Sequence, residues 1–282
     1  MLAIIFRLFP KYGVTNLYAI ITNYFTCFLI GSSIHGSSTF TRATVSETWF
    51  PYALFLSLTF ILFFNVNAFT LQKVGMIITS VFQKLSLVAP VILGLLFFGE
   101  VATALKILAI ILTVIAIILI NYTDKNDAEM VAKMKQYWYW PLLVFFGSGL
   151  IEATLFYAEV TGKINNAGLE FTSTLFLMAG VWGLLFMLIT RKTDVKRNDI
   201  IGGVLIGIPN FFTIYLIMKG LEVGYEGSVL FPVNNVGTIF LTAIVGIFFF
   251  SEKLNLANKL GLALALVSVS YTHLTLPTTP YV

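Results

Sequence analysis

The sequence predicts an all-α integral membrane protein with about ten transmembrane helices, arranged as two inverted five-helix repeats. Three observations lead to this prediction: the composition, the spacing of apolar runs, and a pair of short motifs that recur in the same order. Of the 282 residues, 58% are hydrophobic and 11% are charged, whereas a soluble domain averages about 25% charged residues. The composition therefore indicates a polytopic membrane protein and excludes an ordinary soluble domain.

Apolar runs separated by polar or Gly/Pro breaks predict the individual segments. The first run is short, at about residues 1–12. The others lie at about 14–34, 49–70, 75–98, 102–121, 138–158, 169–190, 199–218, 224–250 and 256–271. The longest predicted loop, 122–137, contains six charged residues and separates two groups of five segments.

Short motifs recur in the two groups. The first group has VGMIIT at 74–79 and FFGE at 97–100, and the second has VGYEGS at 223–228 and FFSE at 249–252. The shared order predicts a duplicated five-helix unit. Because five is odd, the second copy starts from the opposite side of the membrane, which gives an inverted repeat of the kind found in many transporters.

These motifs, with QKLSLVAP (83–90), GIPNFFTIYLIMKGL (207–221) and FPVNNVG (231–237), resemble the drug/metabolite transporter superfamily, specifically EamA-type bacterial transporters. The resemblance covers about residues 1–270. It implies a first repeat at 1–121, an inter-repeat loop at 122–137 and a second repeat at 138–270. It also implies multi-pass insertion in the cytoplasmic (inner) membrane of a bacterium and a central cavity.

The final stretch, YTHLTLPTTPYV at 271–282, departs from the family pattern. It has no charge and resembles a translated cloning or sequencing adapter, so we interpret it as a non-native tail. A short natural tail is the alternative interpretation.

One lysine lies near the middle of an apolar run. Lys84 is the only charge between residues 75 and 98, and a central lysine costs about 2.5–3.5 kcal/mol on insertion scales. Helical angles place Gln83 and Ser86 on one face and Val81, Leu85 and Val88 on the other, which we expect to face lipid. The cost of Lys84 requires an internal partner.

Glu152 is the only carboxylate near the middle of any other predicted span. We therefore expect Lys84 and Glu152 to face one cavity, either paired directly or sharing a water or a substrate carboxylate. A purely structural ion pair is the alternative. Glu152 is also the candidate for proton coupling, because burial and a nearby lysine act on a carboxylate in opposite directions.

Amides extend the predicted cavity. The candidates are Asn234, Asn235, Asn210 and Asn65, and the alternative for each is an interhelical hydrogen bond without a binding role. Asn65 and Asn67 are two residues apart, so only one is expected to face inward. His35 lies in a predicted loop and is expected to be solvated. Glu100 and Glu252 follow segment ends and are expected to be solvated at the N-terminus of the next helix, where the helix dipole favours an anion.

The function expected from this pattern is secondary transport of a small polar metabolite, such as an amino acid or related solute, with export as the direction. The P-loop motif is absent, so an ion gradient or the solute's own gradient would supply the energy. A passive channel or a non-transporting membrane scaffold is the alternative. No catalytic motif or metal-ligand spacing indicates an enzyme, a cofactor or a metal.

The expected partners are the substrate and the lipid bilayer, with the chain as a monomer or homodimer. The net charge of +4 is spread over short loops and does not indicate nucleic-acid binding. The loops after odd-numbered segments hold twelve Lys and Arg residues and the others hold four. The positive-inside rule then predicts both termini outside, whereas members of the family are usually drawn with both inside, and the sequence leaves both orientations open.

Overall fold

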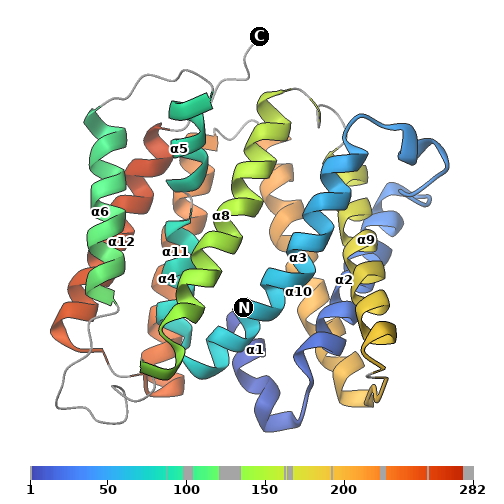
Figure 1. Ribbon diagram of the computed structural model, residues 1–282, viewed down its shortest axis with the longest axis horizontal. Helices are drawn as coiled ribbons and strands as arrows, with labels where there is room; N and C mark the ends of the chain where they lie inside the picture. The colour runs from blue at the N-terminus through green and yellow to red at the C-terminus, as the bar shows by residue number, and fades with distance from the viewer. Residues whose placement is uncertain are drawn as a thin grey trace. The chain divides into compact units, whose positions relative to one another are not determined.

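The computed structural model describes residues 2–86, 88–97, 104–120, 135–161, 163, 168–191, 193–222, 227–252 and 254–275. All regular structure within these ranges is helical (Figure 1), which confirms the all-α prediction. Three of the described helices are long and apolar enough to cross a membrane: α2 (Asn16–His35), α3 (Phe50–Lys73) and α9 (Gly168–Ile189). Each coincides with a segment that the sequence predicted to span.

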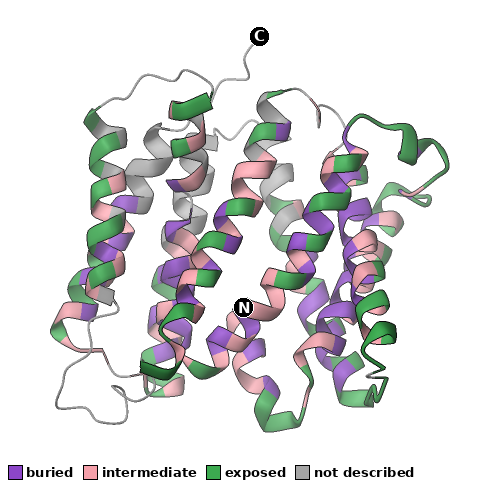
Figure 2. Cartoon of the chain, viewed as in Figure 1, coloured by how far each residue is buried: buried purple, intermediate pink, exposed green. Residues whose placement is uncertain are grey.

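Large apolar side chains remain exposed on these helices and on α6 (Ala104–Ile120) (Figure 2). Examples are Leu62 on α3, Phe186 on α9 and Ile118 on α6, which are 52%, 51% and 63% exposed. Water disfavours apolar exposure on this scale, whereas the hydrocarbon of a bilayer accommodates it. The exposed faces are therefore suited to contact with lipid.

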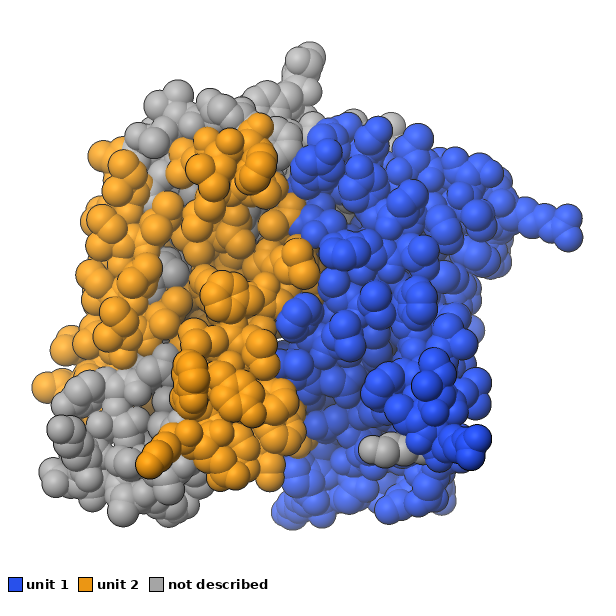
Figure 3. Space-filling model, in the orientation of Figure 1, with its two compact units in different colours: residues 1–68, 154–223 blue, residues 69–153, 224–282 orange. Residues whose placement is uncertain are grey.

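The chain forms two compact units (Figure 3). Unit 1 comprises residues 1–68 and 154–223, and unit 2 comprises residues 69–153 and 224–282. Each unit therefore combines segments from both predicted repeats. The boundaries fall inside α3 after Ala68 and inside α8 (Tyr139–Val160) after Ala153.

Unit 1 begins with a short first segment, as the sequence predicted. Helix α1 (Leu2–Leu8) continues into the 3₁₀ turn η1 (Phe9–Tyr12), which ends at Gly13 with φ +63°. Helix α2 follows, then a loop with the short turn η2 (Ala43–Ser46), then most of α3, and later α9 and α10 (Arg197–Glu222).

Helix α2 is the centre of unit 1, because it packs against both α9 and α10. Gly203 and Gly207 on α10 form a GxxxG spacing that faces α2. A Cβ at Gly203 would lie 2.4 Å from Thr22 Cβ and 2.5 Å from the Ala19 carbonyl oxygen. Small residues at this spacing let helix backbones approach closely in membranes. This GxxxG motif is present in the sequence but was not among the predicted features.

Unit 2 contains α4 (Met76–Leu85), α5 (Val88–Phe97), α6, most of α8, α11 (Gly227–Phe250) and α12 (Leu256–Thr275). Helix α12 packs along α6, and α11 packs against both α4 and α12. Helix α12 continues past residue 270 into the stretch interpreted as a tail, and residues 276–282 lie outside the described part of the chain. The predicted loop 122–137 lies outside it as well, apart from residues 135–137.

The expectation that Val81, Leu85 and Val88 face lipid is wrong. Their side chains are 0%, 1% and 5% exposed. Val81 and Leu85 belong to the core of unit 2, with Phe82, Ala116 of α6, Ile239 of α11 and Ala265 of α12. An apolar face is equally compatible with lipid and with a neighbouring helix, so helical angles alone do not distinguish the two.

The expectation for Glu252 is partly right, because the half-buried residue lies at a helix N-terminus, but that helix is α4 and not α12. Its carboxylate accepts hydrogen bonds from the backbone N–H groups of Met76 and Ile77, the latter at 3.0 Å. It therefore caps the first turn of α4, whose N-cap residue Gly75 has no side chain to do so. A carboxylate at this position satisfies two orphan donors and interacts favourably with the helix dipole. Glu100, the counterpart in the first motif, lies outside the described residues.

Two unusual backbone conformations make this cap possible. Gly75 has φ +126°, which favours glycine, and a Cβ there would lie 3.1 Å from Glu252 Oε1. Ser251 has φ +52° and ends α11, after which the Glu252 N–H donates to the Gly246 carbonyl at 2.9 Å. The chain thus folds back at residue 251 and presents the carboxylate to α4.

We expect Glu252→Ala to destabilise the protein by about 0.5–2 kcal/mol, because two N–H groups of α4 lose their acceptor. Ser251→Gly is the matched control at the neighbouring residue. It should be neutral or stabilising by up to about 1 kcal/mol, since glycine adopts a positive φ without strain. Thermal unfolding in detergent measures both, and equal stability of Glu252→Ala and wild type would contradict the capping role.

The glycine contact in unit 1 gives a second stability prediction. Gly203→Ala should destabilise by about 1–3 kcal/mol, because its Cβ overlaps both a side chain and the backbone of α2. Gly237→Ala on α11 is the control, since no atom of the described part of the chain lies within 4 Å of a Cβ at that position, and alanine favours the helix. If both variants unfold at the same temperature as wild type, α2 and α10 are not in close contact at Gly203.

Candidate functional site

The candidate site is built around a break in the fourth predicted segment. The sequence predicted one helix over 75–98, but the structure has α4 ending at Leu85 and α5 beginning at Val88. The Ser86 carbonyl accepts from the Ala89 N–H at 2.8 Å. Residue 90 is proline and has no N–H to give to residue 86, which explains why the regular ladder stops here.

The side chain of Ser86 joins this break to α8. Its hydroxyl lies 2.6 Å from the carbonyl oxygen of Gln83 and 3.0 Å from Oε2 of Glu152. Ser86 is fully buried and Glu152 is partly buried. The two residues are 66 positions apart in the sequence, so this contact requires the tertiary fold of unit 2. The sequence placed Ser86 on a polar helix face but did not predict its hydrogen bond to Glu152.

A glycine on α8 permits the close approach. A Cβ at Gly149 would lie 3.1 Å from Ala89 Cβ and 3.7 Å from the Ser86 carbonyl oxygen. Glu152 lies three residues further along α8, about one helical turn. The absence of a side chain at 149 therefore sets the separation at which Glu152 reaches Ser86.

Lys84 lies on the last turn of α4, two residues before Ser86, and is partly buried. Its charge interacts electrostatically with that of Glu152. Among the side chains that the structure describes, the two form no direct ion pair within 4.0 Å. Both residues belong to unit 2, and the direct partner of the Glu152 carboxylate is Ser86.

The hydrogen-bonding capacity of Ser86 constrains the chemistry of the site. A hydroxyl has one proton to donate, yet the Gln83 carbonyl and the Glu152 carboxylate both lie within reach as acceptors. If Glu152 is ionised, the two oxygens compete for that proton. If Glu152 is protonated, its own O–H can donate to Ser86 while Ser86 donates to Gln83. The arrangement therefore accommodates both protonation states of Glu152.

The remaining predicted site residues are divided between the two units. Asn65 and Asn210 belong to unit 1, whereas Lys84, Gln83 and Glu152 belong to unit 2. The amide of Asn65 donates to the Ile61 carbonyl of its own helix at 2.7 Å, and Asn67 is the more buried of the pair, at 9% exposure. Asn234 and Asn235 lie on α11, and their side chains are outside the described part of the chain.

Asn210 takes part in a polar cluster between α2 and α10. Its amide donates to Asn23 Oδ1 at 3.1 Å and lies 3.8 Å from Cys27 Sγ. The Cys27 thiol in turn lies 3.4 Å from the Gly207 carbonyl oxygen. The cluster sits beside the GxxxG contact and holds the two helices together, which corresponds to the interhelical alternative for Asn210.

Unit 1 also contains buried polar atoms without a hydrogen-bond partner among the described residues. They are Asn23 Nδ2, Tyr24 Oη, Asn67 Oδ1, Ser173 Oγ, Thr174 Oγ1 and Trp182 Nε1. Buried polar groups in proteins are nearly always satisfied by protein or by ordered water. The interior of unit 1 therefore offers positions for water between its helices.

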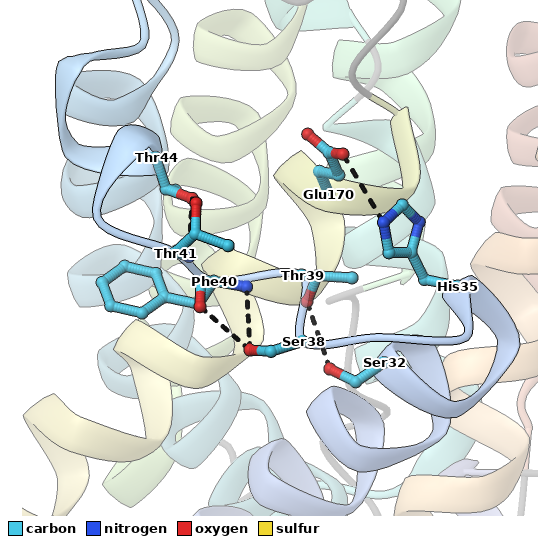
Figure 4. A network of polar contacts seen from close by, with 8 residues as sticks. All are labelled: Ser32, His35, Ser38, Thr39, Phe40, Thr41, Thr44 and Glu170. Carbon is cyan, nitrogen blue, oxygen red and sulfur yellow. Dashed lines mark hydrogen bonds and ion pairs between the residues drawn. The ribbon is translucent and has the colours of Figure 1, made fainter.

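A further polar network orders the loop after α2 (Figure 4). His35, the last residue of α2, lies 3.7 Å from Glu170 in the first turn of α9. The other contacts join Ser32 of α2 to Thr39 in the loop, Ser38 to Phe40 within the loop, and Thr41 to Thr44 of η2. His35 is exposed, as expected from the sequence, with 35% of its side chain accessible, so its contact with Glu170 is made at the surface.

Comparison with known proteins gives one distant relative and no family. No family model matches the chain. An uncharacterized protein of Haemophilus influenzae is 24% identical over 249 residues, which span 87% of this chain and 82% of the relative. The similarity therefore extends across both predicted repeats, and the relative's name describes no activity.

The contact at Gly149 gives a prediction for the site. Gly149→Ala should lower the thermal stability, because its new Cβ presses on Ala89 Cβ. Combining it with Ala89→Gly should restore much of the loss, since the opposing Cβ is then absent. The test is a double-mutant cycle of unfolding in detergent, with an expected coupling of about 0.5–2 kcal/mol. Strictly additive effects would mean that α8 does not approach the break at Gly149.

Proposed function

We propose that this protein is a secondary transporter for a small polar solute, an amino acid or a related metabolite, in the inner membrane of a bacterium. The single observation that carries the proposal is the Ser86–Glu152 hydrogen bond at the break between α4 and α5, next to Lys84. No catalysis, cofactor or metal is part of the proposal.

A broken helix with charged side chains has a characteristic use in membranes. Backbone that leaves the helical ladder at membrane depth is tolerated where it is buried in protein or lines a water-filled cavity. In several transporter folds such breaks form the binding site for solute and coupling ion. Intramembrane charges are likewise concentrated at solute pathways and proton relays.

The packing within each unit supports an inverted repeat of ten segments. In that arrangement α2 corresponds to α9, α4 to α11, and α6 to α12. Each of these pairs is in contact, as expected when a two-fold axis passes between equivalent helices. The cap from Glu252 to Met76 and Ile77 joins the end of one fourth segment to the start of the other.

The charges at the break suit a solute that carries both a cation and an anion. Lys84 can attract a carboxylate, and Glu152 can attract an ammonium group, which together match an amino acid. Because the site accommodates Glu152 with or without its proton, exchange of that proton for the solute provides a coupling mechanism. Proton-driven export is the direction that we propose.

Lys84→Met and Glu152→Gln should each abolish transport, because removal of one charge leaves the other without its electrostatic partner in an apolar surrounding. Breaking a buried ion pair in direct contact typically costs about 3–5 kcal/mol in proteins. A smaller cost is expected here, because the two partly buried groups make no direct ion pair, and expression of each single variant should fall accordingly. The double variant should recover expression but not transport. Lys259→Met, at an exposed lysine of unit 2, is the matched control and should behave as wild type.

The measurement begins with a screen for altered metabolite sensitivity in cells that express the protein, compared with an empty vector. Counterflow in vesicles then follows the solute that the screen identifies, with and without an imposed proton gradient. Normal transport by Lys84→Met would refute the assigned site. Uptake without saturation or counterflow would indicate a passive channel, and no flux for any solute would favour a non-transporting scaffold.

A further inference from the structure

A pocket of about 320 Å³ lies between the first segment and α10 in unit 1. One wall comes from α1 and η1, through Ile5, Leu8 and Phe9. The opposite wall comes from α10, through Ile201, Gly202 and Leu205. All six residues are apolar, so the interior of the pocket has no group that would recognise a polar solute.

Glycine at 202 helps to keep this space open. A Cβ there would lie 3.1 Å from both Phe9 Cε1 and Val14 Cγ1. The rim faces outward, since Ile201 and Leu205 are 45% and 54% exposed. On a helix with further exposed apolar residues, such as Ile200 and Ile208, an outward-facing apolar pocket is open to lipid chains.

One end of the pocket is polar and lies where the helices begin. Asn198 and Tyr12 line it, and the Asn198 amide donates to the Tyr12 carbonyl at 3.0 Å. The fully buried Asp199 fixes this end, because its carboxylate accepts from the backbone N–H groups of Thr15 at 2.6 Å and Lys196 at 2.8 Å. Asp199 therefore holds the start of α2 beside the start of α10.

Cations flank this polar end. Lys11 precedes Tyr12, and Lys196 and Arg197 precede Asn198. All three are exposed, and Lys11 Nζ lies 5.9 Å from the centre of the Tyr12 ring. Two acidic residues lie close to them in sequence, Asp194 and Asp199. Asp199 is engaged with backbone N–H groups. The exposed Asp194 offsets one of the three exposed cations, so the net exposed charge at this end is positive.

The pocket has an apolar interior that is open to lipid and a basic end at the helix termini. These two parts match the acyl chain and the anionic headgroup of a phospholipid. We propose that this pocket binds a phospholipid with an anionic headgroup, with an acyl chain between the first segment and α10 and the phosphate near Lys11 and Arg197. Basic pockets between membrane helices bind anionic headgroups in other proteins, and each nearby cation strengthens binding to an anionic surface. The proposal needs a membrane location and does not depend on transport.

Native mass spectrometry of the purified full chain in detergent tests the proposal. The probes are phosphatidylglycerol and phosphatidylcholine with identical acyl chains, titrated separately. We expect phosphatidylglycerol to bind at least about tenfold more tightly than phosphatidylcholine. In the double variant Lys11→Gln/Arg197→Gln this preference should disappear, because each removed charge should weaken phosphatidylglycerol binding about fivefold. The affinity for phosphatidylcholine should not change. Lys73→Gln/Lys259→Gln removes two lysines assigned to unit 2 and should keep the preference.

A second pair of variants tests the chain-binding part. Ile201→Trp places a large side chain at the pocket and should weaken both lipids at least about fivefold. Ile200→Trp, at the neighbouring exposed residue outside the lining, should have no effect. Thermal unfolding of each variant without added lipid establishes that it is folded.

Four outcomes would overturn the proposal. The first two are equal binding of the two lipids to wild type, and an equal loss of phosphatidylglycerol affinity in the two double-charge variants. The third is equal lipid binding by the two tryptophan variants. The fourth is that glycerol phosphate alone protects against unfolding as well as phosphatidylglycerol does. The last would identify a site for a soluble phosphate ester. Transport measurements are not involved, so failure here leaves the proposed transport function untouched.

Discussion

A backbone polar group that is buried without a partner costs free energy, and this constraint explains the construction of unit 2. The fourth segment is interrupted between α4 and α5, which creates orphan groups at an additional pair of helix ends. At the break itself, Ala89 donates to the Ser86 carbonyl. The start of the segment, which exists without the break, is satisfied by Glu252. The side chain of Ser86 then connects the break to Glu152. The polar site is thus part of the solution to a backbone problem.

Much of the fold could be predicted because the signals were long and local. Composition and apolar runs located α2, α3 and α9, and the short first segment was also apparent. The faces that these helices present could not be predicted in the same way. Val81 and Leu85 are as apolar as a lipid-facing residue, yet they pack inside unit 2. The GxxxG spacing at 203–207 would have identified the α2–α10 contact.

The candidate site was predicted in part. The prediction of one cavity for Lys84 and Glu152 came from their depth in two predicted segments. The structure places both in unit 2, with Ser86 as the direct partner of Glu152. The break at Ser86 was not predicted, although Pro90 marks it, since many membrane helices tolerate proline. The role of Glu252 depends on a turn at Ser251 and a contact with a distant glycine, and neither has a signature in a single sequence.

The cap on α4 also orders events during synthesis. Glu252 follows Met76 by 176 residues, and at about 5–20 residues per second the ribosome takes roughly 9–35 s to cover that distance. Helix α4 is therefore synthesised long before its N-terminal acceptor. The same holds for α2, whose neighbours α9 and α10 arrive late. Both units close only after translation of the second half, so a ribosome stalled between the halves leaves neither unit complete.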